Sequence, residues 1–142
     1  MENKWFDLID DNIKNNRDSI YFVGSNDEHR RTGKTTALIK ISLMYSIPII
    51  VDNMTVLKFV NSTLNNNIAN IINDIETIPT STKLKYLIGD SLPDVAFWLP
   101  NFRGFKFENG ILIEECASRY FFEIAQNATS NGIKIRGGFC RI

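Results

Sequence analysis

Short runs of consecutive apolar residues recur along the chain, separated by longer segments of mixed polarity. Runs that are apolar at successive positions are typical of strands buried on both faces of a parallel sheet. They occupy residues 20–23, 49–51 and 111–113, and Ile133-Lys134-Ile135, with a lysine in the middle, opens a last expected strand. These runs predict four strands, the last of them close to the C-terminus.

The segments between the runs repeat apolar residues every three or four positions, which indicates amphipathic helices. We expect helices over residues 2–16, 34–45, 54–64, 68–75 and 117–129. Asn65-Asn66-Asn67 should weaken or break the helix between 54 and 75, because asparagine is a poor residue for a helix interior. Residues 83–109 are ambiguous, with extended patterns at 86–88 and 105–107 and either a helix or a strand at 94–99.

The elements follow the order of an N-terminal helix and then β-α-β-α-β-α-β. Strands that alternate with helices predict parallel strands joined by right-handed crossovers. No repeat or low-complexity linker interrupts the chain. Residues 1–142 are therefore expected to form a single α/β domain.

Composition narrows the function classes only slightly. Sixteen basic residues balance sixteen acidic ones, so net charge does not indicate nucleic-acid or membrane binding, although it leaves room for a local basic patch. The N-terminus lacks the apolar stretch of a signal peptide and no run is long enough to span a bilayer, so we expect a cytoplasmic protein without membrane contact. One histidine and two cysteines do not indicate a zinc site. The abundance of Asn, Ile and Lys suggests an AT-rich genome, such as that of a phage or a low-GC bacterium; a phage protein would act in the host cytoplasm.

The polar loop between the first strand and the next helix carries the strongest chemical signal. It ends in Arg30-Arg31-Thr32-Gly33-Lys34-Thr35-Thr36. A loop with Gly-Lys-Thr at a helix start predicts a P-loop, in which backbone N–H groups and the helix N-terminus surround phosphates. In this interpretation Lys34 reaches the β- and γ-phosphates of ATP, and the Thr35 hydroxyl binds Mg²⁺.

The loop departs from the usual P-loop spacing. Four residues normally separate its two glycines, but position 28 is Glu and the next upstream glycine is Gly24. The loop is therefore either longer than usual or lacks its first glycine. His29-Arg30-Arg31 then lies where extra positive charge could meet the phosphates.

A second expected element of such a site is a buried strand that ends in carboxylates. Ile111-Leu112-Ile113 is followed directly by Glu114 and Glu115. We expect Glu114 to support the magnesium and Glu115 to act as the general base that polarises the attacking water. Asp90, after the shorter run Leu87-Ile88-Gly89, is a rival candidate for the metal.

Together these segments resemble the ATPase core of phage large terminases and related additional-strand P-loop ATPases. The resemblance rests on residues 30–36, on Arg103-Gly104 and on residues 111–117, within the span 19–136. It implies a three-layer α/β/α P-loop fold with a small, mainly parallel sheet of strand order 1-4-3-2. It also implies that Lys34 and Thr35 bind phosphate and magnesium, that Glu115 is catalytic, and that Arg30 or Arg31 senses the γ-phosphate.

Two departures from the family pattern separate this chain from a packaging enzyme. Glu114 stands where the family has a metal-binding Asp. In addition, we expect the sheet to end with its fourth strand, without a lid or a nuclease domain. The chain is then expected to be a stand-alone relative, a subunit or a repurposed core.

Three functions follow from these observations. The first is a small Mg²⁺-dependent ATPase, which could act in a nucleic-acid process. The second is a nucleoside or nucleotide kinase, with Asp52 as the acid after the second strand, although no arginine-rich lid is visible. The third is a nucleotide-binding or interaction module that does not hydrolyse. A homo-oligomer, a partner protein and nucleic acid all stay open as partners.

Several other residues have a chemical as well as a structural interpretation. Arg119, Arg136 and Arg141 are candidate arginine fingers across a subunit interface, or ordinary surface arginines. The aromatic-rich stretch from Phe97 to Phe107 favours core packing or a subunit contact over base stacking. Cys116 is interpreted as a small buried residue rather than a nucleophile.

Overall fold

The computed structural model describes residues 3–24, 33–74, 96–97, 102–103 and 107–142. Its helices are α1 (Lys4–Lys14), α2 (Lys34–Tyr45), α3 (Met54–Asp74) and α5 (Ser118–Ser130), and its strands are β1 (Ser19–Val23), β2 (Ile49–Ile50), β3 (Ala96–Phe97), β4 (Ile111–Ala117) and β5 (Ile135–Arg141). The chain is thus an α/β fold, as the alternating pattern predicts. No helix in the described part of the chain has the length and apolarity needed to cross a bilayer.

The strands form one parallel sheet in the order β1-β5-β4-β2-β3. This differs from the expected four-stranded sheet of order 1-4-3-2, because Ala96–Phe97 add a fifth strand at the edge beside β2. The sequence of residues 94–99 was compatible with a helix or a strand. A strand of only two residues is too short to show the alternation of apolar and polar side chains that would identify it. The expectation that the sheet stops at four strands is therefore wrong.

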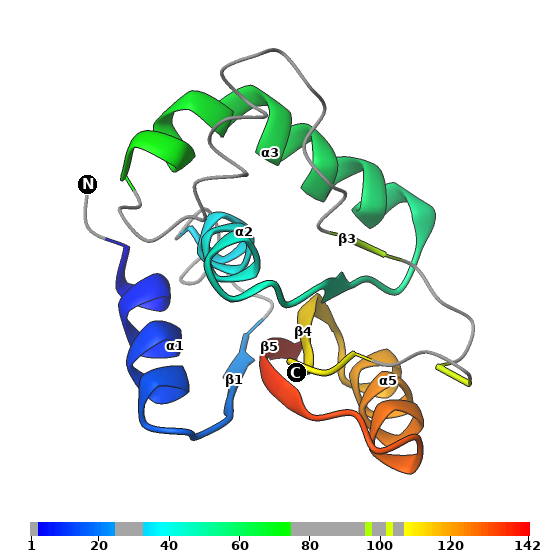
Figure 1. Ribbon diagram of the computed structural model, residues 1–142. Helices are drawn as coiled ribbons and strands as arrows, with labels where there is room; N and C mark the ends of the chain where they lie inside the picture. Colours follow the sequence, from blue (N-terminus) through cyan, green and yellow to red (C-terminus); the bar gives the residue numbers. More distant parts are fainter. Residues whose placement is uncertain (1–2, 25–32, 75–95, 98–101, 104–106) are drawn as a thin grey trace.

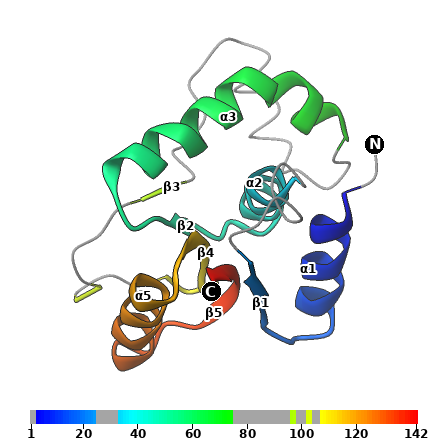
Figure 2. The same ribbon diagram turned by 180° about the vertical axis from the view of Figure 1, so that it is seen from behind.

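Helices cover both faces of the sheet (Figures 1 and 2). On one face, α1, α2 and α3 bury apolar side chains against Leu112 and Phe139, which come from the two central strands β4 and β5. On the other face, α5 buries Phe121 and Ala128 against Ile111, Ile113 and Cys140 of the same two strands. Residues 111, 112 and 113 alternate between the two cores, so the continuous apolar run fits a strand that is buried on both sides.

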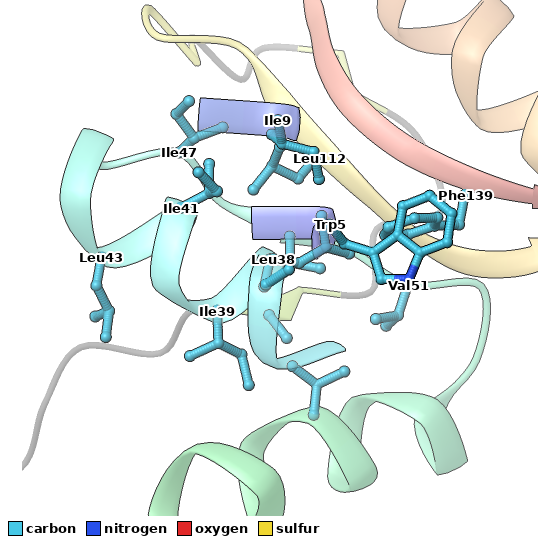
Figure 3. Packing of buried hydrophobic residues seen from close by; sticks show 14 of the residues in the cluster. Trp5, Ile9, Leu38, Ile39, Ile41, Leu43, Ile47, Val51, Leu112 and Phe139 are labelled. Carbon is cyan, nitrogen blue, oxygen red and sulfur yellow. The ribbon is translucent and has the colours of Figure 1, made fainter. Parts of the chain in front are cut away.

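The N-terminal helix α1 packs through one apolar face, as its periodicity predicts. Trp5 and Ile9 are buried in this face. The Trp5 ring lies edge-on to Phe139 of β5, with centroids 5.1 Å apart, and Figure 3 shows both among the clustered side chains of this core. Helix α1 is thereby fixed beside α2, close to the start of the latter.

Helix α3 is continuous across Asn65-Asn66-Asn67, so the predicted break is wrong. An asparagine in a helix interior costs only about 0.7 kcal/mol relative to alanine. Leu64, directly before the asparagines, and Val60, one turn earlier, are buried in the core that α3 shares with α2. We infer that this packing outweighs the local preference of the asparagines.

Strand β5 runs through Gly137 and Gly138 to Arg141, well beyond the short apolar run that predicted it. A Cβ atom at position 138 would lie 2.9 Å from the carbonyl oxygen of Ile113 and 3.2 Å from the ring of Phe121. The absence of a side chain therefore lets α5 pack closely over β5. Glycine lowers strand propensity, which is why the sequence pattern hid most of this strand.

Candidate functional site

A cleft of about 510 Å³ opens where the carboxyl ends of β4 and β5 meet the N-terminus of α2. Its lining residues are Gly33, Lys34, Thr35, Thr36, Val56, Phe59, Thr63, Glu114, Glu115 and Arg141. Four elements that are distant in sequence thus contribute to one site. In open parallel α/β sheets, ligands bind outside the carboxyl ends of the strands, which is the position of this cleft.

Helix α2 begins at Gly33 without a capping side chain. Gly33 has φ +85°, a left-handed conformation that favours glycine, and the first turn of the helix carries no acidic residue. The positive end of the helix dipole is therefore not neutralised by a carboxylate within its own first turn. This end of α2 contributes Lys34, Thr35 and Thr36 to the cleft.

Glu114 is the buried carboxylate of the site, with only 5% of its surface exposed. Its Oε1 accepts hydrogen bonds from the Thr35 hydroxyl (3.2 Å) and from the Glu115 backbone N–H (3.0 Å). Its Oε2 is buried and has no hydrogen-bond partner among the described residues. A buried oxygen without a partner is costly, so the geometry favours a ligand at this position.

Burial raises the pKa of Glu114 to about 7, because water is excluded from its charged form. The two hydrogen bonds to Oε1 and the positive charge of Lys34 oppose this rise, and the negative charge of Glu115 adds to it. The carboxyl group is thus close to half protonated at neutral pH. A cation bound next to it would favour its ionised form.

Glu115 is more accessible and lies between two cationic side chains. Its Oε1 is 3.5 Å from Lys34 Nζ, and its Oε2 is 4.0 Å from an Arg141 guanidinium nitrogen. The Glu115 side chain is 27% exposed and that of Lys34 is 10% exposed. A carboxylate that lines the cleft can accept a proton from a bound water.

The structure brings six of the predicted site residues together: Gly33, Lys34, Thr35, Thr36, Glu114 and Glu115. The predicted residues Arg30, Arg31 and Thr32 and the rival ligand Asp90 lie outside the described residues. No group of three or more His, Cys, Asp or Glu side chains in the described part of the chain is arranged as a metal site. Among the described residues, the Thr35 hydroxyl and the Glu114 carboxylate bring side-chain oxygens together at 3.2 Å.

The three arginines proposed as fingers have different surroundings. Arg141 lines the cleft of its own chain at the end of β5. Arg136 pairs with Asp18 at 3.4 Å, and Arg119 pairs with Glu123 one turn later on α5 at 3.7 Å. Only Arg141 is placed so that it can act on a ligand within the same molecule.

One wall of the cleft was missed by the sequence analysis. Helix α3 contributes Val56, Phe59 and Thr63, and Phe59 is 57% exposed. Phe59 falls outside the apolar stripe formed by residues 56, 57, 60 and 64. This position off the stripe is the sequence feature that could have indicated an exposed aromatic side chain. A large aromatic side chain off the buried stripe of a helix is exposed by necessity, and here it faces a cleft.

The two cysteines are buried and unbridged on neighbouring strands. Burial is the largest cause that raises the pKa of Cys116, to about 12. A thiol with such a pKa is protonated at neutral pH and is a poor nucleophile. The surroundings of Cys116 therefore support its interpretation as a packing residue.

Comparison of the chain with protein-family models, with curated proteins and with solved structures gave no match.

Proposed function

We propose that this protein is a small Mg²⁺-dependent ATPase that binds the phosphates of ATP at the N-terminus of α2. The observation that carries the proposal is the contact between Thr35 at the start of α2 and Glu114 in the middle of β4, 79 residues later. The residue types and their positions are those expected of a phosphate loop and an acidic strand.

The donor set at this contact fits magnesium. Mg²⁺ prefers oxygen ligands and is usually held by one or two protein groups together with substrate phosphates. The Thr35 hydroxyl and the Oε2 of Glu114, which has no hydrogen-bond partner within the described ranges, would supply these protein oxygens. When bound, the ion would neutralise charge that develops on the phosphates.

The other residues of the cleft have complementary roles in this proposal. Lys34 and the backbone amides of the first turn of α2 bind phosphate oxygens. Glu115 takes the proton of the attacking water. Arg141 supplies a second positive charge next to Glu115 and the phosphates.

The arrangement of the sheet supports the same proposal. Strand β5 lies between β1, which precedes the loop, and β4, which contains the carboxylates Glu114 and Glu115. This separation by one strand is typical of the additional-strand P-loop ATPases that the sequence resembles. A terminase-like role and a nucleic-acid partner are further parts of this proposal.

Phosphate release by the purified protein tests hydrolysis directly. We expect Mg²⁺-dependent release from ATP, and we expect Glu115→Gln to lower the turnover rate by about 10²–10⁴ while ATP binding remains. Glu123→Gln, on the exposed side of α5, is the matched control and should hydrolyse as wild type. Equal turnover in wild type and Glu115→Gln would contradict the assigned base. DNA or RNA in the same assay tests nucleic acid as a stimulating partner.

The wall formed by α3 favours a second candidate, a nucleoside or nucleotide kinase. Val56 and Phe59 give the cleft an apolar side opposite its charged residues. Such a surface can stack against the base of an acceptor. A kinase would transfer phosphate only when an acceptor is added. Phe59→Ala would then weaken binding of the acceptor more than binding of ATP. Binding of ATP with neither release nor transfer would identify a non-hydrolysing module.

A further inference from the structure

We infer that Asn3, the residue before α1, positions the backbone N–H of Lys34 for anion binding. The inference rests on the proposed function, because it assigns to this amide a phosphate oxygen as its ligand. The N-terminal helix α1 would then help to orient a phosphate-binding group, in addition to packing in the core.

The Asn3 side chain joins two helices through its two polar atoms. Its Oδ1 accepts a hydrogen bond from the Phe6 N–H (3.1 Å) and so caps α1. Its Nδ2 donates to the carbonyl oxygen of Gly33 (3.0 Å), the residue that caps α2. Both ends of the amide are thus used, one within its own helix and one on the phosphate loop.

The bond to Gly33 constrains the next amide because the peptide unit is planar. The C=O of Gly33 and the N–H of Lys34 belong to one trans peptide unit and point in opposite directions. The Gly33 oxygen also accepts the first hydrogen bond of α2, from the Ala37 N–H at 2.9 Å. Two donors on this oxygen fix the peptide plane and thereby aim the Lys34 N–H.

The same bond strengthens the amide as a donor. A hydrogen bond to a carbonyl oxygen polarises its peptide unit, so the N–H of that unit becomes a better donor to an anion. The Asn3 amide therefore affects the Lys34 N–H in both direction and strength.

Asn3 can hold this position because α1 is fixed to α2 along its length. Asp10 of α1 accepts a hydrogen bond from the Tyr45 hydroxyl at the far end of α2. Lys40 of α2 lies over the Phe6 ring, with its Nζ 5.7 Å from the ring centroid. These contacts and the Asn3–Gly33 bond join the two helices at their starts, along their length and at the end of α2.

The fit at Gly33 is close. A Cβ atom built there would lie 2.7 Å from the Asn3 Nδ2. A side chain at position 33 would thus displace Asn3, besides straining the left-handed backbone. Gly33 is therefore required for both the backbone conformation and the contact with Asn3.

Two substitutions separate the contact with Gly33 from the helix cap. Asn3→Ser keeps an oxygen that can cap α1 but has no amide to donate to Gly33, whereas Asn3→Ala loses both functions. We expect both variants to raise the Kd for MgATP about fivefold, the equivalent of one hydrogen bond. Asn3→Ala should lower the melting temperature by about 3 °C more than Asn3→Ser does, because only Asn3→Ala also loses the helix cap. Asn131→Ala, which removes a side-chain bond to Asn127 at the end of α5, is the matched control and should leave the Kd unchanged.

A second readout does not depend on nucleotide. The Lys34 amide proton in the ¹H–¹⁵N spectrum of the nucleotide-free protein should shift upfield in both Asn3 variants and stay in place in Asn131→Ala, because it loses polarisation only in the first two. If wild type binds MgATP and Asn3→Ser binds it equally well, the inference is overturned. If the Kd follows the loss of stability, with Asn3→Ser unaffected, Asn3 is only a helix cap. If wild type does not bind MgATP, the proposed function fails, and an unchanged Lys34 signal would then also overturn the orienting role of Asn3.

Discussion

Helices α2 and α5 both begin near the carboxyl ends of strands, both lack a side-chain N-cap, and neither has an acidic residue in its first turn. Of these two helices, α2 borders the cleft and α5 does not. Six residues of α2 are buried, because the helix lies between the sheet, α1 and α3, whereas α5 buries only Phe121 and Ala128. The comparison indicates that an uncapped helix start becomes a candidate anion site when its surroundings hold it in place and carboxylates and cations converge on it.

The charged side chains at the two helix starts also differ in their exposure to water. The first turn of α5 carries Arg119, which is 80% exposed and pairs with Glu123 on the surface. The first turn of α2 carries Lys34, whose side chain is 10% exposed and close to Glu115. An exposed ion pair contributes little to stability, while charges in a cleft with limited water interact more strongly.

The largest difference between the helices should appear in stability. Ile39 of α2 is fully buried, and Figure 3 shows it in the core cluster, whereas Ile124 of α5 is only partly buried. We expect Ile39→Ala to lower the free energy of unfolding by about 3 kcal/mol and Ile124→Ala by about 1 kcal/mol. Urea denaturation measures both values. Equal losses would contradict the view that α2 is the more firmly held helix.

The next largest effect concerns the pH dependence of stability. Glu114 has a pKa of about 7 in the folded protein and an ordinary value near 4.5. The folded state therefore binds the proton more tightly, so the contribution of this group to stability is fully present below pH 4.5 and is lost as pH rises to about 7. Glu114→Gln removes this loss. We expect the variant to gain about 2 kcal/mol over wild type at pH 8 without magnesium, and little at pH 4.5.

Two controls sharpen this prediction. Glu123→Gln on the exposed surface of α5 should show no such pH-dependent gain. Addition of Mg²⁺ and ATP to wild type should reverse the order of stability at pH 8, because the bound ion favours the ionised carboxylate. A gain in Glu114→Gln that is the same at pH 4.5 and pH 8 would show that the carboxyl group does not titrate in this range.

The smallest of these effects compares two arginines. Arg141 lines the cleft 4.0 Å from Glu115, whereas Arg119 lies on the surface of α5. We expect Arg141→Ala to raise the Kd for MgATP about fivefold, as for a partly exposed charge–phosphate contact, and Arg119→Ala to have no effect. Isothermal titration calorimetry measures both. An equal effect of the two substitutions would remove Arg141 from the site.

The sequence predicted those parts of the molecule in which one residue pattern has one interpretation. Successive apolar residues before Glu114 favoured a strand buried on both faces, and they form the start of β4. Likewise, Gly33-Lys34-Thr35 between a strand and a helix was sufficient to place the start of α2. The P-loop interpretation of the same residues stays a prediction.

Other features depend on distant contacts, so local patterns could not reveal them. The asparagines at 65–67 remain helical because residues elsewhere on α3 are buried. Strand β5 tolerates Gly138 because α5 packs over it. The bond from Asn3 to Gly33 joins residues 30 positions apart, and no spacing rule relates them.

The most direct test of the account is a titration of the purified protein with ATP in the presence of Mg²⁺. We predict saturable binding to wild type and to Lys134→Ala, whose lysine is exposed, and about 30-fold weaker binding to Lys34→Ala, the expected loss for a charge-assisted phosphate contact. Absence of saturable binding to wild type, or equal affinity of wild type and Lys34→Ala, would contradict the claim that the start of α2 binds a nucleotide phosphate.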